Sequence, residues 1–316
     1  MIEIRGLTKV YGRTTAVDDL TVTVRPGVVT GFLGPNGAGK STTMRAVVGL
    51  DRPTSGEVLV DGRRYADHPA PLHQVGALLD AGAVHPGRSA RNHLRALAAT
   101  NGIGHRRVDE VLELVGLSEV AGRRVGGFSL GMSQRLGIAA TLLGDPAVIL
   151  LDEPVNGLDP DGIRWIRGLL RALAAEGRTV FVSSHLMSEM ALTADHLVLL
   201  GRGRLLADVS MQQMTATATG RVTVRTPQPE ELTRLLVVAG AVVSRPEPDV
   251  LTVTGTTAEE IAGTALAARI LLTELVPVHA SLEEAYLAMT ADDVQYRSTT
   301  PATPATDPTA PRRAAA

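Results

Sequence analysis

The sequence contains no cysteine, which excludes disulfide bonds and thiolate metal sites and fits a reducing compartment. Aromatic side chains are also scarce, at 3% of the chain. Tyr11, followed by Gly12, therefore stands out as a candidate for stacking on a nucleobase. A structural tyrosine at the edge of a strand is the alternative that these residues leave open.

Long hydrophobic runs are missing too. Residues 147–151 form one of the longest, far short of the ~20 residues that a membrane-spanning helix needs. The first residues lack a basic region followed by an apolar one, so we expect no signal peptide. A net charge of −2 gives no electrostatic case for a nucleic-acid partner. We therefore expect a soluble or peripheral protein with one large domain or two unequal ones.

Lysine is scarce as well: of the 31 basic residues, only Lys9 and Lys40 are lysine. Lys40 belongs to the run Gly34, Pro35, Asn36, Gly37, Ala38, Gly39, Lys40, Ser41. This run matches G-x-x-x-x-G-K-[ST], a loop whose backbone N–H groups surround phosphates while Lys and Ser/Thr reach the terminal phosphate and Mg²⁺. We place Thr42 in the same site. The stretch 28–33 predicts a buried strand into the loop and 41–49 a helix out of it. The alternative is an ordinary glycine-rich turn.

Around this loop the chain predicts an α/β domain. Residues 2–33 indicate short β segments broken by Gly and Pro. From about 76 to 145 the pattern becomes helical, with helices near 90–99 and 107–115 and Gly116 as a C-cap. We interpret this region as a helical insert. Ser129 is a candidate N-cap for a further helix, whose start offers a second anion site.

The apolar run at 148–153 ends in two acids, Asp152 and Glu153, as expected where a buried parallel strand opens onto an active site. Asp152 is a candidate Mg²⁺ ligand and Glu153 a candidate general base for water. His185 follows the next predicted strand, 179–184, and can contact the γ-phosphate. The alternatives are that the acids merely cap a turn and that His185 caps a helix. Residues 196–207 predict a hairpin that closes the domain.

The last third of the chain shows no catalytic constellation. Its segments between 221 and 277 follow a βαββαβ order, which suggests a small α+β ferredoxin-like domain. We place this domain at residues 220–290, including a segment at 281–289. From 291 to 316 the chain is rich in Thr, Pro and Ala, so we expect a disordered tail.

Taken in order, the phosphate loop, the Ser129 segment, residues 148–153, residues 156–159 and His185 resemble the nucleotide-binding subunit of ABC transporters across residues 1 to about 219. The resemblance implies a P-loop ATPase core with an antiparallel β part and a helical insert. It also implies that two ATP molecules lie between the subunits of a head-to-tail dimer, formed with a second copy or a related subunit. It implies that Ser129 and Gly131 face the γ-phosphate across the interface with Met132 beside them. Asp159 would couple the two sites, and Tyr11 would stack on adenine.

Two positions depart from the family pattern. The usual Leu-Ser-Gly-Gly-Gln signature is replaced here by Phe-Ser-Leu-Gly-Met at residues 128–132. The loop that enters the insert usually carries a Gln that touches Mg²⁺, and Asp80 takes that place. A carboxylate at Asp80 can still coordinate Mg²⁺.

These variants, and the segment at 281–287, are similar to the branch of ABC ATPases that serves drug and antibiotic exporters. The resemblance implies an ATP-hydrolysing subunit at the cytoplasmic face of the cell membrane that drives a separate transmembrane permease. Two other interpretations stay open: a soluble ABC ATPase without a transport role, and a regulatory module that binds nucleotide without turnover.

Overall fold

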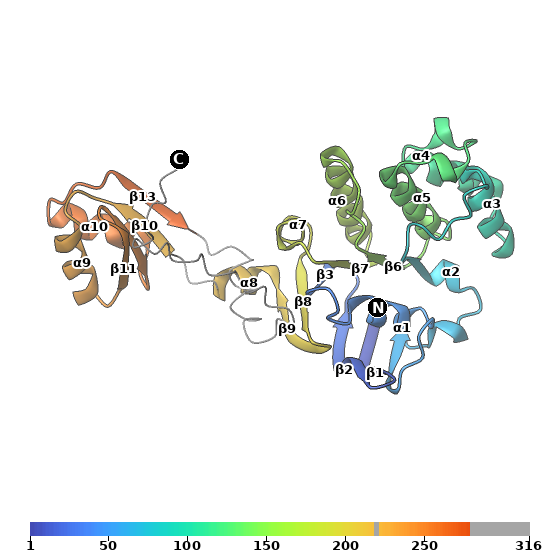
Figure 1. Cartoon of the computed structure of the whole chain (residues 1–316), viewed down its shortest axis with the longest axis horizontal. Helices are drawn as coiled ribbons and strands as arrows, with labels where there is room; N and C mark the ends of the chain where they lie inside the picture. Colours follow the sequence, from blue (N-terminus) through green and yellow to red (C-terminus); the bar gives the residue numbers. More distant parts are fainter. Residues whose placement is uncertain (218–220, 279–316) are drawn as a thin grey trace, which may run out of the picture.

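The computed structural model describes residues 1–217 and 221–278. Its centre is a six-stranded sheet in the order β5-β6-β7-β3-β8-β9 (Figure 1). The strands are β3 (Val29–Leu33), β5 (Val75–Leu78), β6 (Val148–Asp152), β7 (Thr179–Ser184), β8 (His196–Gly201) and β9 (Arg204–Ser210). All neighbours pair in parallel except β8 and β9, which form the predicted hairpin.

Both faces of this sheet are buried, which explains why its strands are apolar without alternation. Ile149 and Leu151 of β6 pack among the helices on one face. Val148 and Leu150 of the same strand pack on the other face, together with Phe32. The ring of Phe32 lies 4.8 Å from that of Phe181 on β7.

An antiparallel sheet and the helix after the phosphate loop cover the second face. The sheet has the order β2-β1-β4 and comprises β1 (Ile2–Tyr11), β2 (Thr14–Val24) and β4 (Ser55–Val60); the helix is α1 (Lys40–Val47). The prediction of short strands here is wrong, because β1 and β2 run for 10 and 11 residues. Irregular pairing beside Gly6, at φ 57°, lets both strands continue past the glycine.

Helices cover the first face, and α3 (Ala90–Thr100), α4 (His105–Leu114), α5 (Leu130–Leu142), α6 (Pro160–Ala175) and α7 (Met187–Ala191) lie above the sheet in Figure 1. The short helix α2 (Pro71–Gln74) precedes β5, and α8 (Met211–Thr217) follows β9 and contributes Met214 to the same core. Single 3-10 turns lie at Tyr65–Asp67, Ser118–Val120 and Val125–Gly127, and Tyr65 packs on the other face. The predicted helices near 90–99 and 107–115 are confirmed as α3 and α4. Gly116 ends α4 as expected, at φ 71°. The insert was expected from about residue 76, but Val75–Leu78 pair with β6 and belong to the central sheet.

Residues 221–278 form a separate unit with the predicted βαββαβ order. Its elements are β10 (Arg221–Arg225), α9 (Pro229–Val238), β11 (Val242–Glu247), β12 (Val250–Thr254), α10 (Ala258–Ala267) and β13 (Glu274–Val278). The sheet is antiparallel in the order β11-β12-β10-β13, as in ferredoxin-like folds. The segment predicted at 281–289 and the tail from 291 lie outside the described residues.

In the described ranges, no helix combines the length and the apolar character that crossing a bilayer would require.

Candidate functional site

The candidate site lies where three parallel strands end. Leu33 of β3 is paired with Ser184 of β7, and Asp152 of β6 with Ser183 of β7. The residues that follow these strands therefore emerge at the same edge of the sheet. This places the phosphate loop, Glu153 and His185 next to one another, as the sequence predicted.

Two glycines allow the phosphate loop to pack tightly. Gly39 precedes α1 at φ 103°, and a Cβ at this residue would lie 2.5 Å from the carbonyl oxygen of Ala16. A Cβ on Gly34 would lie 2.6 Å from the carbonyl oxygen of Leu200. Side chains are therefore excluded at both positions.

Lys40, the first residue of α1, is 6% exposed. Its Nζ donates to the carbonyl oxygen of Gly34 at 2.7 Å and to that of Pro35 at 3.3 Å. Burial lowers the pKa of the Lys40 ammonium, although the carboxylates of Glu153 and Asp152 oppose the shift. A partly desolvated ammonium beside a helix N-terminus attracts an anion strongly.

A cavity of about 500 Å³ opens on this loop, and we name it the phosphate cavity. It is lined by Tyr11, Ala16, Asn36, Gly37, Ala38, Gly39, Lys40, Ser41, Thr42, Glu153, Asn156 and His185. It therefore brings together most of the predicted nucleotide-binding residues and both predicted catalytic residues. Gly34 and Pro35 contribute to the site through the carbonyl groups that hold Lys40.

Glu153 has a left-handed backbone conformation, φ 51°, which is costly for a residue with a Cβ. Its N–H donates to Oγ of Ser183 at 3.0 Å. Its carbonyl oxygen accepts from Nε2 of Gln134, a buried residue of α5, at 3.4 Å. The Ser183 hydroxyl also donates to the carboxylate of Asp152. Ser183 thus ties the two acids together, and neighbouring elements hold the strained backbone of Glu153.

The side chain of Glu153 is in contact with three polar groups. Oε2 lies 2.7 Å from Nδ1 of His185, within hydrogen-bonding distance. Asn156 Nδ2 donates to the same oxygen at 3.4 Å, and Oε1 lies 4.0 Å from Nζ of Lys40. A carboxylate held in this way can orient a water molecule and accept its proton.

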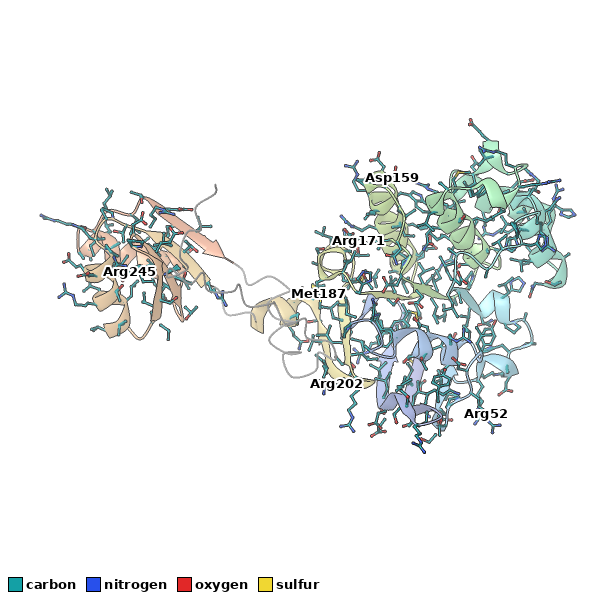
Figure 2. The ribbon with its side chains drawn as sticks, in the orientation of Figure 1. Arg52, Asp159, Arg171, Met187, Arg202 and Arg245 are labelled. Atoms are coloured by element: carbon teal, nitrogen blue, oxygen red, sulfur yellow. The ribbon has the colours of Figure 1, made fainter. Side chains whose placement is uncertain are left out.

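A second cavity, of about 540 Å³, gathers the Ser129 segment, and we name it the signature cavity. It is lined by Ser129, Leu130, Gly131, Met132, Arg135, Gly157, Leu158 and Asp159. Ser129 is the N-cap of α5 as predicted, since its Oγ accepts from the N–H of Met132 at 3.2 Å. Asp159, labelled in Figure 2, caps α6 by accepting from the N–H of Gly162 at 2.9 Å.

The family signature has glycine at the position of Leu130. The Leu130 side chain packs directly against Gly157, which leaves room for it. A Cβ on Gly157 would lie 2.2 Å from Cδ2 of Leu130, and Gly157 has φ 76°. The Leu130 side chain nevertheless stays 62% exposed. The departure from the family pattern is therefore accommodated by Gly157 while the start of α5 stays accessible.

Of the three predicted Mg²⁺ ligands, only Ser41 lines the phosphate cavity. Asp152 lies next to it through Ser183 and Glu153, whereas Asp80 lines neither cavity. Asp80 is exposed and follows β5, and its Oδ1 accepts from the N–H of Gly82 at 2.7 Å. The carboxylate thus stabilises its own turn. A metal-binding role for Asp80 stays a prediction.

Several residues in or next to the two cavities were not predicted as site residues. Ser183 and Gln134 act through hydrogen bonds to Asp152 and Glu153 from other elements, and no local pattern marks them. Ala16 approaches the loop through its carbonyl oxygen, which lies close to Gly39. Only Asn156 had a signal in the sequence that could have marked it as a site residue, because it lies three positions after Glu153.

Comparisons with known proteins agree with this geometry. A family model described as "ABC transporter" matches residues 17–156, and one described as "Domain of unknown function (DUF8746)" matches residues 220–283. The bacitracin transport ATP-binding protein BcrA of Bacillus licheniformis is 42% identical over 217 residues, which is 68% of this chain and 71% of that protein. The lantibiotic transport ATP-binding protein SrtF of Streptococcus pyogenes is 35% identical over 66% of this chain and 90% of its own length.

Solved structures of similar fold include the dimeric bacterial ABC transporter cassette MJ0796. It superposes with a TM-score of 0.62 at 26% identity, covering 67% of this chain and 99% of that one. The same cassette in a post-hydrolysis state, bound to ADP and Pi, gives a TM-score of 0.62 at 25% identity over the same shares. Given these relatives and the two cavities, the chain belongs to the ABC transporter family and is an ATP-binding, ATP-hydrolysing subunit of that family.

Proposed function

We propose that this chain binds ATP in the phosphate cavity and hydrolyses it to drive a separate membrane-embedded exporter. The observation that carries the proposal is the position of Glu153, whose carboxylate faces the same cavity as the phosphate loop. It lies 4.0 Å from Nζ of Lys40 and 2.7 Å from Nδ1 of His185. A base is thus held beside the groups that would bind the terminal phosphate.

In this proposal the triphosphate lies against the backbone N–H groups of residues 36–42 and the ammonium of Lys40. Tyr11, at another part of the cavity wall and 46% exposed, stacks on the adenine ring. Both ends of a nucleotide then contact the same cavity.

The donor set at this edge suits Mg²⁺. The Ser41 hydroxyl and the Asp152 carboxylate are hard oxygen donors, and Mg²⁺ in nucleotide sites combines one or two carboxylates with phosphate oxygens and water. When bound, the ion neutralises charge on the β- and γ-phosphates. Ser183 keeps the Asp152 carboxylate in a fixed orientation through its hydroxyl.

For hydrolysis, Glu153 orients the attacking water and accepts its proton. Nδ1 of His185 is paired with Glu153, so Nε2 is the ring nitrogen directed to the γ-phosphate, and it donates to a phosphate oxygen when the ring carries both protons. Lys40 balances the developing negative charge on the phosphate.

Completing the site requires a second ATPase chain, a copy of this one or a related subunit. The phosphate cavity and the signature cavity share no lining residue within one chain. A head-to-tail dimer would bring Ser129, Gly131 and Met132 of one chain to the phosphates held by the other. Support comes from MJ0796, a similar cassette whose solved structure is dimeric.

The exported compound is proposed to be a drug, an antibiotic or another small amphiphile. The names of BcrA and SrtF, transport ATP-binding proteins for bacitracin and lantibiotics, support this class. Both relatives are named as ATP-binding proteins of transport systems, so we propose a separate permease and a position at the cytoplasmic face of the membrane. A membrane protein that copurifies with the full chain from its native membrane would support this assignment, and absence of any such partner would count against it.

The catalytic proposal is tested by Glu153→Gln, which removes the base and keeps the shape. We expect phosphate release to fall by roughly 10²-fold or more while ATP binding is retained. Glu176→Gln, in an exposed ion pair with Arg178, serves as the matched control and should behave as wild type. Unchanged hydrolysis in Glu153→Gln would show that the assignment of the base is wrong.

A further inference from the structure

Tyr11 is held in place by a hydrogen bond and a cation–π contact with other residues of this chain. Its hydroxyl donates to Oδ2 of Asp51 at 2.8 Å, and Nζ of Lys9 lies 4.8 Å from the centre of its ring. Lys9 is in turn fixed by donating to the carbonyl oxygen of Arg52 at 2.7 Å. One face of the ring thus carries a cation, and the phenol is anchored at its tip.

Asp51 is the centre of this arrangement. Its Oδ2 also accepts from Nε of Arg45 at 2.7 Å, and its side chain is 14% exposed. Partial burial alone would raise the pKa of Asp51, but hydrogen bonds from Arg45 and Tyr11 outweigh it and hold the pKa below its usual range. The Asp51 carboxylate is therefore ionised at neutral pH. Its Oδ2 accepts a charge-assisted hydrogen bond from Arg45 and a second hydrogen bond from the Tyr11 hydroxyl.

The same network is attached to the helix of the phosphate loop. Arg45 lies in the last turn of α1, which begins at Lys40. The N–H groups of Leu50 and Asp51 donate to the carbonyl oxygen of Arg45 at 2.9 and 3.3 Å. One short helix therefore carries the phosphate-binding residues at its start and positions Asp51 just past its end.

We infer that Asp51, together with Arg45 and Lys9, is a positioning residue that fixes the Tyr11 ring as a stacking platform for a purine base. The inference rests on the proposed role of Tyr11 in the nucleotide site. The ring is 46% exposed and lines the phosphate cavity, so the surface not covered by Lys9 is open to a ligand. A platform that is already ordered loses less conformational entropy when the base stacks on it.

The network also determines what the platform can recognise. Burial and the hydrogen bond to Asp51 raise the pKa of the Tyr11 phenol, so the hydroxyl remains a donor that is already engaged. The ring then offers a base its π face and no free donor. This contact should strengthen binding of ATP and GTP to the same extent, because every purine presents a stacking face.

The test measures dissociation constants by calorimetry in a Glu153→Gln background, where bound ATP is not consumed. The ligands are ATP, GTP and inorganic tripolyphosphate, which lacks a base. We expect Asp51→Ala to weaken ATP and GTP by about fivefold each and to leave tripolyphosphate unchanged. Asp51→Asn, which keeps an acceptor oxygen, should weaken both nucleotides by only about twofold. With Glu153 intact, Asp51→Ala should raise the KM for ATP by about fivefold, and a fall in kcat with KM unchanged would contradict the positioning role.

Tyr11 variants show whether Asp51 acts through the ring. Tyr11→Ala should weaken ATP by about tenfold or more, and adding Asp51→Ala to it should cause no further loss. Tyr11→Phe keeps the ring without the hydroxyl and should resemble Asp51→Ala. Glu57→Gln, a carboxylate paired with Arg5 in the same antiparallel sheet, is the control that should change nothing.

The possible failures are distinguishable. If Tyr11→Ala weakens ATP but Asp51→Ala does not, the stacking proposal stands and the positioning role is wrong. If Asp51→Ala weakens tripolyphosphate, or weakens ATP equally in the Tyr11→Ala background, Asp51 does not act through the ring. If Tyr11→Ala leaves ATP binding unchanged, the proposed stacking itself fails, and the role of Asp51 fails with it. Thermal unfolding of each variant checks that the chain is folded.

Discussion

The two cavities of the ATPase core differ in the chemistry they hold. The phosphate cavity contains the carboxylate of Glu153 between the ammonium of Lys40 and the imidazole of His185. The signature cavity contains the start of α5, the Ser129 hydroxyl and small or apolar residues, with Asp159 and Arg135 at its wall. One cavity can perform acid–base chemistry, whereas the other can only bind and orient an anion.

This difference indicates how the work is divided between two chains. Gln134 lies on the helix that begins in the signature cavity, and its amide contacts the backbone of Glu153 in the phosphate cavity. Within one chain, this hydrogen bond joins the helix that begins in the signature cavity to the backbone of Glu153. In the proposed dimer, each chain would supply catalytic groups to one ATP and an anion-binding helix start to the other.

The largest expected effect comes from damaging the two cavities in different chains. Lys40→Ala removes the ammonium that binds phosphate in the phosphate cavity. Ser129→Asp should repel phosphate from the signature cavity while keeping an N-cap for α5. We expect each variant alone to lose hydrolysis by roughly 10²-fold, and a mixture to regain part of it. The recovery follows because a mixed dimer contains one undamaged composite site. Phosphate release is the readout, with the uncharged Ser129→Asn as control.

Failure of the mixture to recover any activity, with dimers present by light scattering, would contradict the division between the cavities.

A smaller effect is expected from Ser183→Ala. The change removes the acceptor for the partly buried N–H of Glu153 and the donor to Asp152. Loss of such bonds costs ~1–3 kcal/mol, so we expect the turnover rate to fall about tenfold with ATP affinity retained. Steady-state kinetics would check this, with Ser184→Ala as the neighbouring buried control. A change in ATP affinity alone would show that Ser183 does not act on the acids.

The signature cavity is tested separately by Gly157→Ala. A Cβ would lie 2.2 Å from Leu130, and φ 76° is strained for alanine. We expect ~1–3 kcal/mol of lost stability and several-fold slower hydrolysis, with unchanged ADP binding by the single chain. Leu130→Ala in the same variant should restore part of the stability by removing the clash. Thermal unfolding and calorimetry measure the two quantities; weakened ADP binding would mean that the cavities are not independent.

The smallest effect on hydrolysis is expected from a change outside both cavities. Leu232 is fully buried in the core of residues 221–278, a cluster that shares no residue with the two cores of the ATPase part. Leu232→Ala should destabilise this unit by ~2–5 kcal/mol and leave hydrolysis by the ATPase part within about twofold. Limited proteolysis would locate the loosened unit. A large drop in hydrolysis would show that this unit controls the ATPase.

Local patterns in the sequence predicted much of this molecule. The phosphate loop, the Ser129 N-cap and the glycine that ends α4 depend on backbone rules that act within a few residues. The βαββαβ order of the last unit followed from segment periodicity. The long hairpin of β1 and β2 was missed because bulges conceal the continuity of strands that contain glycine.

Other features could not be predicted, because they depend on residues far apart in the chain. Ser183 bridges two acids about thirty positions earlier, and Gly157 provides the space that Leu130 needs. Asp51 contacts Tyr11 across forty positions. Hydrogen bonds and steric fit of this kind arise only when separate elements pack, and a single sequence carries no signal for them.

By itself, the sequence determined that this chain has a phosphate loop, an acid pair after a buried strand and a capped helix at Ser129, because each is specified by neighbouring residues. Only the tertiary structure decided that these parts form two separate cavities, that Asp80 stabilises its own turn, and that Tyr11 is fixed by Asp51. The physical reason is distance along the chain: parallel pairing of β3, β6 and β7 brings groups more than a hundred residues apart to one sheet edge, and packing then decides which of them meet.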